Sequence, residues 1–350
     1  MNKVFRPIAA ILLVFLSIKS SRVEAFSNIG QDIPANYRLL KTIRILTLNV
    51  YGKKEKRCAS RLKAIGKKVL AADPPYDIVS FNEHYDPMVK LWLSCDGDYL
   101  TNEMLRDGRY KDEKGIIRYH QQYPNGRFYQ ANGGNSLFTL HNITKFDYWK
   151  FTNHRKFVAN GYLFNRIKIS KDLSIDFWTA HLEAAGGDDC SEACRIKQTK
   201  ELLLKIKKHR RGNPVIVAGD FNIGGPRNQI ERQKHLAEPV EIPYRGNSGY
   251  EKIIKLFDYP RDVWLEKNSS MEPIDSYTYD CYRNTTTKKH CEDFYRIDYL
   301  FIPTSLKFQN PNYKIEIIES KVTRWKTDSG IDVSDHYGVE ATLKIYKKFD

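Results

Sequence analysis

The sequence predicts a mixed α/β (α+β) fold, a four-layer sandwich in which two mixed β-sheets pack face to face with helices outside. Short apolar runs, typical of buried strands, recur along the 350-residue chain, and several of them end in a polar cluster. Amphipathic helices separate some of these runs, whereas others alternate in polarity as the strands of a hairpin do. Mixed sheets covered by helices are the architecture that this order of elements favours.

Residues 1–25 have the pattern of a secretory signal peptide. Lys3 and Arg6 precede an apolar stretch at 8–18, and residues 23–25 suit signal peptidase cleavage. The alternative is a retained membrane anchor, but the stretch is too short to span a bilayer comfortably. We therefore expect a secreted, extracellular protein. No linker or internal repeat divides residues 26–350, so we expect them to form a single domain.

The sequence of the first half of this domain predicts a strand, a helix and a second strand. The first strand runs from Ile43 to Asn49, and the second lies at 77–83. Between them, residues 59–72 have helical periodicity. Four apolar side chains share one face of this helix: Leu62, Ile65, Val69 and Leu70.

The second half begins with an expected hairpin and continues with a helix and further strands. Residues 161–169 alternate in polarity, and a short turn separates them from the strand at 175–179. We expect one face of this hairpin to be exposed to water. Residues 191–209 form an amphipathic helix, followed by a buried strand at 215–218. Three side chains of this helix should point inward: Ile196, Leu203 and Ile206.

Polar side chains with catalytic potential stand at the ends of the predicted strands. Where several strands deliver such groups to the edge of a sheet, the groups can converge on one site. A carboxylate also lies in the predicted strand at 296–302. The candidates are Asn49, Glu83, His181, Asp220 with Asn222, Asp298, and Asp335 with His336.

The oxygen-bearing candidates suit a hard cation such as Mg²⁺, which prefers carboxylate and amide oxygens and binds substrate phosphate. Asn49 and Glu83 can hold one ion. Asp220 and Asn222 point the same way from an extended segment and could serve a second ion or phosphate oxygens. Taken singly, a strand-end Asn is usually a turn residue, a lone Glu usually lies on the surface, and the Asp220–Asn222 turn is common without catalysis.

His181 and His336 supply groups for proton transfer. Hydrolysis of a phosphoester needs a base to activate water and an acid to protonate the leaving oxygen, and imidazole titrates in the right range for both. An isolated histidine could instead be a hydrogen-bonded core residue. Adjacent side chains diverge on a strand, so Asp335 is poorly placed to orient His336. Asp298, on another strand, is better placed.

Six cysteines in an oxidising compartment indicate disulfides: Cys58, Cys95, Cys190, Cys194, Cys281 and Cys291. The favoured local pairings are Cys190 with Cys194 and Cys281 with Cys291. Zinc binding is the alternative, but no CxxC pair occurs. Three glycosylation sequons also fit a eukaryotic secretory route, at Asn142, Asn268 and Asn284.

The chain is strongly basic. Its formal net charge is +15, of which residues 1–25 contribute +3 and residues 26–350 the remaining +12. A basic surface attracts polyanions, either nucleic acid or acidic membrane, and does not choose between them. Four aromatic residues close together could insert into a lipid interface, although core packing is the more common fate of such a cluster. They are Phe146, Tyr148, Trp149 and Phe151.

Six ordered motifs make the chain resemble the endonuclease/exonuclease/phosphatase superfamily, which includes DNase I-like nucleases, inositol-polyphosphate phosphatases and neutral sphingomyelinases. The motifs are Thr47-Leu48-Asn49, Asn82-Glu83, Thr179-Ala180-His181-Leu182, Gly219-Asp220-Phe221-Asn222, Arg296-Ile297-Asp298-Tyr299 and Ser334-Asp335-His336. The resemblance covers about Ile43 to Leu343, and the six motifs are specific together. It implies that 26–350 is one catalytic domain of this type.

Further segments resemble the secreted neutral sphingomyelinase branch in order and spacing. They are Gly134-Asn135-Ser136-Leu137, Gly161-Tyr162-Leu163-Phe164, Glu183-Ala184, Arg195 with Gln198, and Asp275-Ser276-Tyr277-Thr278-Tyr279-Asp280. The chain departs from the branch at Asn82, where Gln is frequent, and at Asn160, where Lys is frequent.

By this resemblance Asn49 and Glu83 would bind the catalytic Mg²⁺, for which Mn²⁺ or Co²⁺ could substitute, and His336 would be the base. His181, Asp220 and Asn222 would support the phosphate and the leaving group, with Asp220 and Asn222 also available to metal. Asp335 would lie on the metal side, and Asp298 would orient the histidine.

Three functional classes follow. The leading one is a secreted Mg²⁺-dependent phosphodiesterase that cleaves sphingomyelin, a phospholipid at a membrane surface, to ceramide and phosphocholine. The second is a secreted DNase I-like endonuclease, which the +12 charge favours by its attraction for nucleic acid. The third is a binding or effector module that has lost catalysis, against which the complete metal and histidine set argues. No stable protein partner is expected.

Overall fold

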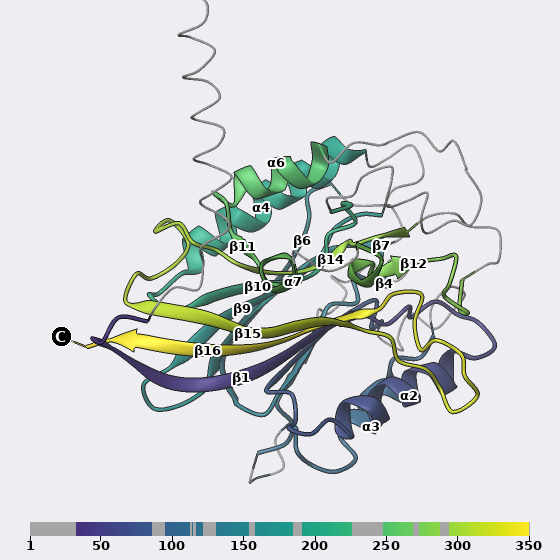
Figure 1. The fold of residues 1–350 in the computed structure, drawn as a ribbon. Helices are drawn as coiled ribbons and strands as arrows, with labels where there is room; N and C mark the ends of the chain where they lie inside the picture. The colour runs from purple at the N-terminus through teal and green to yellow at the C-terminus, as the bar shows by residue number, and fades with distance from the viewer. Residues whose placement is uncertain are drawn as a thin grey trace, which may run out of the picture.

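Two six-stranded sheets stack face to face between two layers of helices in the computed structural model (Figure 1). The predicted four-layer α/β sandwich is therefore confirmed. The structure describes residues 33–85, 95–112, 114, 117–121, 131–153, 158–184, 191–225, 248–268, 273–287 and 294–349. The predicted signal peptide at 1–25 lies outside these residues.

One sheet carries the first two predicted strands. Its strands, in spatial order, are β15 (Tyr313–Thr323), β16 (Gly338–Lys348), β1 (Tyr37–Asn49), β2 (Ile78–Asn82), β5 (Ser136–Thr139) and β3 (Tyr119–Gln121). β1 and β2 are parallel, and the other neighbours are antiparallel. Because β1 and β2 run in the same direction, the residues at their carboxyl ends meet at one edge of this sheet.

The second sheet has the same mixed character. Its strands, in spatial order, are β11 (Arg261–Asp262), β14 (Asp298–Ile302), β10 (Val215–Asp220), β9 (Ser174–His181), β8 (Gly161–Lys168) and β6 (Asn142–Lys150). β9 and β10 are parallel, and the remaining pairs are antiparallel. Two small ribbons pair β12 (Tyr279–Asp280) with β13 (Phe294–Tyr295) and β4 (Ala131–Asn132) with β7 (Val158–Ala159).

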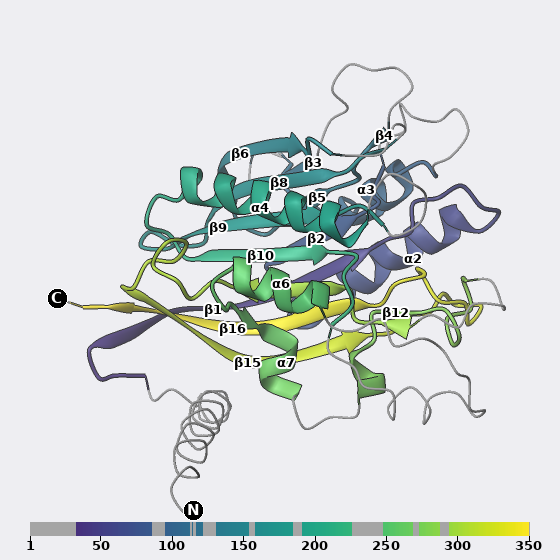
Figure 2. The same ribbon diagram turned by 90° about the horizontal axis from the view of Figure 1, so that it is seen from above.

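Helices cover the outer faces of both sheets. α2 (Cys58–Leu70) and α3 (Asp98–Met104) lie on the first sheet, and α4 (Glu192–His209) and α6 (Ser248–Leu256) lie across the second (Figure 2). The two predicted helices thus begin and end within two residues of the expected positions. The remaining helical elements are α7 (Val263–Asn268) and a 3₁₀ turn at Pro273–Ser276. None of the described helices combines the length and the hydropathy needed to cross a bilayer.

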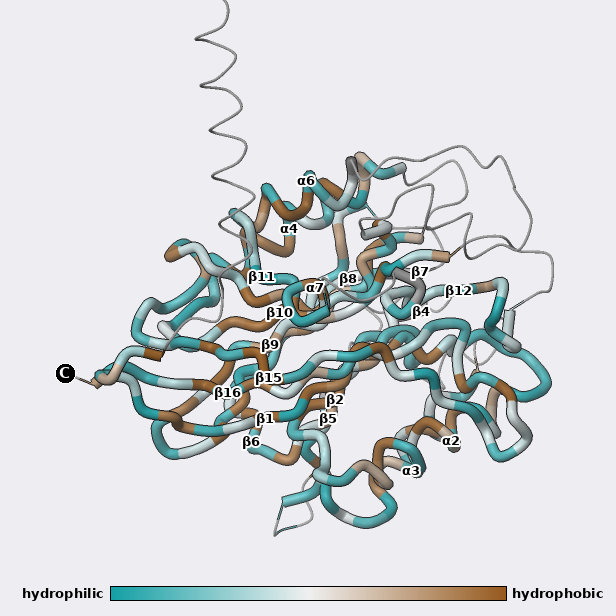
Figure 3. Tube along the Cα trace, in the orientation of Figure 1, coloured by the Kyte–Doolittle hydropathy of each residue, from teal (hydrophilic) through white to brown (hydrophobic). Residues whose placement is uncertain are grey.

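Side chains alternate between the central and the outer layers of the core. On β10, Ile216 and Ala218 face the other sheet, while Val215 and Val217 pack against the helices. The apolar segments accordingly follow the strands in the middle of the sandwich (Figure 3). Full burial of one Ile or Val side chain contributes roughly 1.5–3 kcal/mol, so this core holds the strand ends in fixed positions.

The expectation that one face of the 161–179 hairpin is exposed to water is wrong. On β8, Leu163 and Ile167 pack into the centre of the sandwich, and Tyr162 and Phe164 are buried on the other face. The reason is that α4 covers the outer face of this hairpin, where Leu202 joins the same cluster. A helix contributed by a later part of the chain cannot be inferred from the alternation of the hairpin itself.

The aromatic segment at 146–151 belongs mainly to this core. Phe151 is fully buried, and Trp149 stacks on Trp178 with ring centroids 5.9 Å apart. Phe146 is 46 % exposed. Core packing, the more common fate of such a cluster, thus accounts for Trp149 and Phe151.

A disulfide joins Cys58 at the start of α2 to Cys95 before α3. Cys194 and Cys281 are also disulfide-bonded, but Cys190 and Cys291 lie outside the described residues. The pairings Cys190–Cys194 and Cys281–Cys291 therefore stay predictions, which non-reducing peptide mapping can check.

Candidate active site

Three site residues lie side by side at one edge of the second sheet. In the strand register His181 pairs with Asp220, and Asp220 pairs with Asp298. β14 is antiparallel to β10, so its first residue lies beside the last residue of β10. The carboxyl ends of two parallel strands and the amino end of a third therefore place an imidazole and two carboxylates in a row.

The first sheet supplies the opposing groups. Asn49 ends β1, and Glu83 follows β2 directly. The Asn49 amide Nδ2 donates to Asp220 Oδ2 at 3.0 Å and lies 3.3 Å from Glu83 Oε1. Face-to-face packing of the two sheets thus joins residues 171 positions apart in the chain.

Two of the candidates have a strained backbone. Glu83 has φ 55° and Asn222 has φ 50°, a left-handed conformation that costs a non-glycine residue of order 1–3 kcal/mol. Gly134 packs so closely on Glu83 that a Cβ at this glycine would lie 2.6 Å from the Glu83 Cα. Such strain persists only where surrounding structure holds it, and both strained positions carry predicted site residues.

Asp220 lies at the centre of the group. Its Oδ2 lies 3.6 Å from His181 Nε2 and 3.9 Å from His336 Nε2, and its Oδ1 accepts the backbone N–H of Asn222 at 2.8 Å. Burial, followed by the negative charge of Asp298, raises the pKa of Asp220 to about 6, although the two histidines oppose the shift. The folded protein therefore disfavours the ionised form of Asp220, and a carboxylate with such a raised pKa is typical of functional sites.

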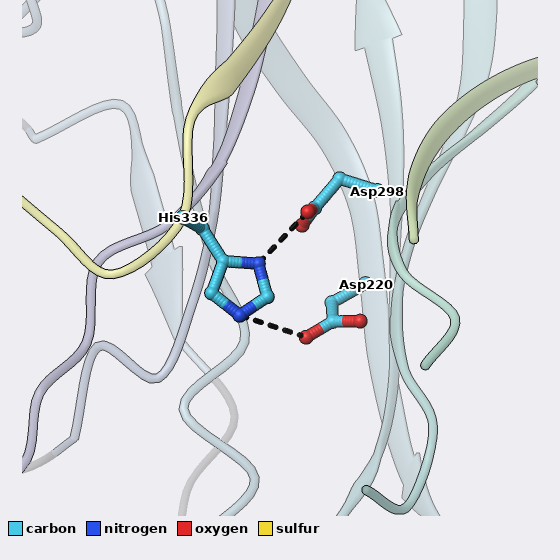
Figure 4. A group of neighbouring side chains, drawn as sticks. All are labelled: Asp220, Asp298 and His336. Carbon is cyan, nitrogen blue, oxygen red and sulfur yellow. Dashed lines mark hydrogen bonds and ion pairs between the residues drawn. The ribbon is translucent and has the colours of Figure 1, made fainter. Parts of the chain in front are cut away.

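His336 is held between two carboxylates, as Figure 4 shows. Its Nδ1 lies 2.8 Å from Asp298 Oδ2, and its Nε2 faces Asp220. The predicted contact between Asp298 and His336 is confirmed. Burial lowers the pKa of His336, but the carboxylates of Asp298 and Asp335 outweigh it and raise this pKa to about 10. The site without metal thus favours the doubly protonated imidazolium.

The residues around Glu83 fit a divalent cation. Glu83 Oε2 is buried and has no hydrogen-bond partner, although buried polar atoms are nearly always paired. Burial raises the pKa of Asp335 to about 6, and the nearby Glu83 carboxylate acts in the same direction while His336 opposes it. The buried Asp335 carboxylate and the half-buried Glu83 carboxylate, which repel each other, match the oxygen ligands that Mg²⁺ prefers, and Glu83 contributes the unpartnered oxygen.

The two amides of the predicted metal set serve as hydrogen-bond donors in this structure. Asn49 offers its nitrogen to the carboxylates while its Oδ1 accepts the N–H of Tyr51 at 3.0 Å. Asn222 donates from Nδ2 to the Leu182 carbonyl at 2.9 Å. As a ligand, Asn49 would have to present its oxygen by rotation of the amide plane.

A second set of ligand atoms has a different character. Asp220, Asp298 and His336 each place one such atom within 4.8 Å of the others. Asp298 Oδ2 and His336 Nδ1 are joined by a hydrogen bond, which turns His336 Nε2 toward Asp220. Asp298 Oδ1 is buried without a hydrogen-bond partner, as Glu83 Oε2 is. The paired imidazole between two carboxylates suits proton transfer.

Two hydroxyls that secure the site belong to motifs that carry the family resemblance, although neither was among the predicted site residues. Ser334 donates to the Asn49 carbonyl at 2.6 Å and accepts the His336 N–H at 3.1 Å. Thr278 Oγ1 accepts the backbone N–H groups of Ile297 and Asp298, both at 3.1 Å. No sequence periodicity marks these hydroxyls, because their partners come from distant segments.

Arg61 also supports the site and was not predicted, although its position in the sequence indicated that it would be buried. It is fully buried and donates to the carbonyls of Val333 at 2.9 Å and Tyr51 at 3.0 Å. It thereby joins the loop after Asn49 to the loop before His336. Its spacing of four from Ile65 placed it on the apolar face of the helix, where a charge needs buried partners.

The structure thus brings all eight predicted residues into one connected group. A model of the Endonuclease/Exonuclease/phosphatase family matches residues 46–336, which include every one of them. The chain belongs to this family. Its members are phosphoesterases that depend on divalent metal ions. Comparison with curated protein sequences gives no significant match.

Solved structures show the same fold at low sequence identity. TDP2 from D. rerio, complexed with single strand DNA product, has a TM-score of 0.61 and 18 % identity over 87 % of this chain and 99 % of its own. SmcL has a TM-score of 0.58 and 16 % identity over 88 % and 99 %. Beta toxin from Staphylococcus aureus, as a mutant with bound magnesium ions, has a TM-score of 0.56 and 16 % identity over 86 % and 99 %.

Proposed function

We propose that this family member is a secreted, Mg²⁺-dependent phosphodiesterase that hydrolyses sphingomyelin to ceramide and phosphocholine. The observation that carries the hydrolytic part is the short Asp298–His336 contact beside Asp220, with the orphaned Glu83 oxygen in the same group. Proton-transfer groups next to a cation site are what metal-assisted phosphodiester hydrolysis requires.

The residues divide the proton transfers between them. Asp298 accepts the Nδ1 proton of His336, so Nε2 is the nitrogen that takes a proton from the attacking water. Asp220 faces the same nitrogen and stabilises the imidazolium that forms. His181, on the other side of Asp220, is placed to support the leaving group. Glu83 and Asp335, with Asn49 after an amide rotation, would hold the divalent ion, which offsets the negative charge that develops on the phosphoryl group.

The support for a sphingomyelin substrate comes from the segments that resemble that branch. Asn135 donates to the Gly161 carbonyl at 2.8 Å, and Gln198 accepts the Glu183 N–H at 3.0 Å. These segments come from separate parts of the chain, and both contacts lie close to the end of β9 at His181, since Gly161 begins the neighbouring β8 and Glu183 follows His181 by two positions.

The two departures from the branch have defined places in this network. Asn82 accepts the Asp220 N–H at 3.0 Å, and Asn160 donates to the Leu182 carbonyl at 3.1 Å. Both amides therefore support the backbone at His181 and Asp220, which is compatible with the proposed assignment.

A nuclease is the second candidate, and two observations favour it. Residues 26–350 carry a net charge of +12, which attracts polyanions. One similar structure, TDP2 from D. rerio, holds a single strand DNA product. An inactive effector is a weaker candidate, because the Asp298–His336 contact and the buried Glu83 oxygen would have no structural benefit of their own.

The deciding experiment identifies products from sphingomyelin vesicles, other choline lipids, inositol phosphates and plasmid DNA in Mg²⁺. We expect phosphocholine from sphingomyelin and far slower nicking of plasmid. His336→Ala, purified in parallel, controls for contaminating activity and should lose turnover by about 10²- to 10⁴-fold. Rapid degradation of plasmid with intact sphingomyelin would establish the nuclease instead.

A further inference from the structure

The three glycosylation sequons have very different environments in the folded protein. An N-glycan is attached through the side-chain amide nitrogen of asparagine, so that nitrogen must face open space in the native state. Asn142, Asn268 and Asn284 can therefore be compared by the burial and the hydrogen bonds of this one atom.

The Asn284 amide is part of the active-site framework. The residue is buried, and its Nδ2 donates to the Ser334 carbonyl at 2.8 Å. Its Oδ1 accepts the N–H of Thr286, the third residue of the sequon, at 2.8 Å. A glycan on this nitrogen would have to occupy the packed region beside the His336 loop.

The Asn268 amide is equally occupied. Asn268 is buried at the end of α7, and its Nδ2 donates to the carbonyls of Trp264 at 3.0 Å and Ser320 at 2.8 Å. The second bond attaches α7 to β15 of the other sheet. Replacement of one amide hydrogen by a sugar would break one of these buried bonds.

Asn142 differs from both. It is exposed as the first residue of β6, which lies at the edge of its sheet. Asn142 pairs with Lys168 at the end of β8 that lies farthest from the site. β8 is eight residues long, which puts Asn142 roughly 20 Å along the sheet from the catalytic edge.

We propose that Asn142 is the N-glycan acceptor of this protein and that Asn268 and Asn284 are structural amides that remain unmodified in the folded enzyme. The reaction uses a lipid-diphosphate-linked oligosaccharide. Its anomeric C–O bond breaks, the Nδ2–C bond of Asn142 forms, the lipid diphosphate leaves and the amide loses one proton. A glycan there would also cover an exposed edge strand, which otherwise presents unpaired backbone groups to other chains.

This inference rests on the proposed secretion, so the test is designed to distinguish failure of the secretion proposal from failure of the acceptor assignment. Two versions of the protein are expressed in a eukaryotic host, one with its own residues 1–25 and one with a host signal sequence in their place. The secreted, active fraction is treated with peptide N-glycosidase in heavy-oxygen water, which marks each formerly glycosylated Asn as labelled Asp. Mass spectrometry then locates the label in the three sequon peptides. Because this measurement uses the wild-type protein, it does not depend on whether any variant folds.

We expect the label at Asn142 and at neither of the other two positions. Asn142→Gln should abolish the mobility shift caused by the glycosidase and keep wild-type activity, whereas Asn268→Gln should leave the shift unchanged. A label at Asn268 or Asn284 in the active fraction, or none at Asn142 with the host signal sequence, would overturn the assignment. If only the version with its own residues 1–25 fails to reach the medium, the secretion proposal is wrong and the acceptor assignment stands.

Discussion

Asp298 Oδ2 lies 2.8 Å from His336 Nδ1, although 38 residues separate the two positions in the chain. The contact fixes which imidazole nitrogen faces Asp220 and, through the charge of the carboxylate, helps to raise the pKa of His336 to about 10. A base must be neutral before it accepts a proton, so this relationship controls both the direction and the pH dependence of proton transfer.

Asp298→Asn tests that control. Activity should increase with pH as His336 loses its proton, and removal of the Asp298 charge should shift this increase to lower pH because the imidazolium loses its main stabilising partner. Maximal turnover should fall by about 10²- to 10⁴-fold because the amide no longer enforces the correct tautomer. The measurement is a kcat profile from about pH 5 to 10 in saturating Mg²⁺, and an unshifted profile would contradict the proposed pairing.

Glu83→Gln tests the metal site. Glu83 carries the orphaned buried oxygen, so the neutral amide should weaken Mg²⁺ binding and remove most activity while the fold remains intact. Isothermal titration with Mg²⁺ and circular dichroism would check both parts. A chelator selective for zinc should do little to the wild-type enzyme. Full activity of Glu83→Gln would refute the site assignment.

Asp220→Asn should make the metal-free protein more stable while it removes activity. The pKa of Asp220 is raised from 3.8 to about 6, so the ionised carboxylate penalises the folded state above pH 6. The penalty disappears as pH falls towards 3.8, because the folded protein then binds the proton. We expect a gain of up to about 3 kcal/mol at about pH 8 and almost none at about pH 4. Thermal unfolding in EDTA at both pH values would show this, and a pH-independent difference would exclude it.

Thr278→Val should affect catalysis through Asp298. Valine keeps the volume of Thr278 but removes the hydroxyl that accepts the N–H groups of Ile297 and Asp298, so the carboxylate beside His336 loses its support. We expect a lower kcat with KM little changed, and rescue by Thr278→Ser, which restores the acceptor. A loss of stability that Thr278→Ser fails to correct would indicate a packing role instead.

Local patterns in the sequence were sufficient for the strand ends and the residue types. An apolar run followed by a polar residue predicted Asn49, His181 and Asp220 at the ends of β1, β9 and β10. Helical periodicity predicted α2 and α4 within two residues. These features depend on neighbours a few positions apart, which is the range over which periodicity carries information.

Only the tertiary structure decided which of these groups meet and which surfaces are covered. The contact between Asn49 and Asp220 depends on how two sheets pack, and the burial of the outer face of β8 depends on α4. The Cys58–Cys95 disulfide, the Thr278 support and the burial of Asn284 depend likewise on segments distant in the chain. Such contacts form because the whole sandwich excludes water between its layers, so no local stretch of sequence specifies them.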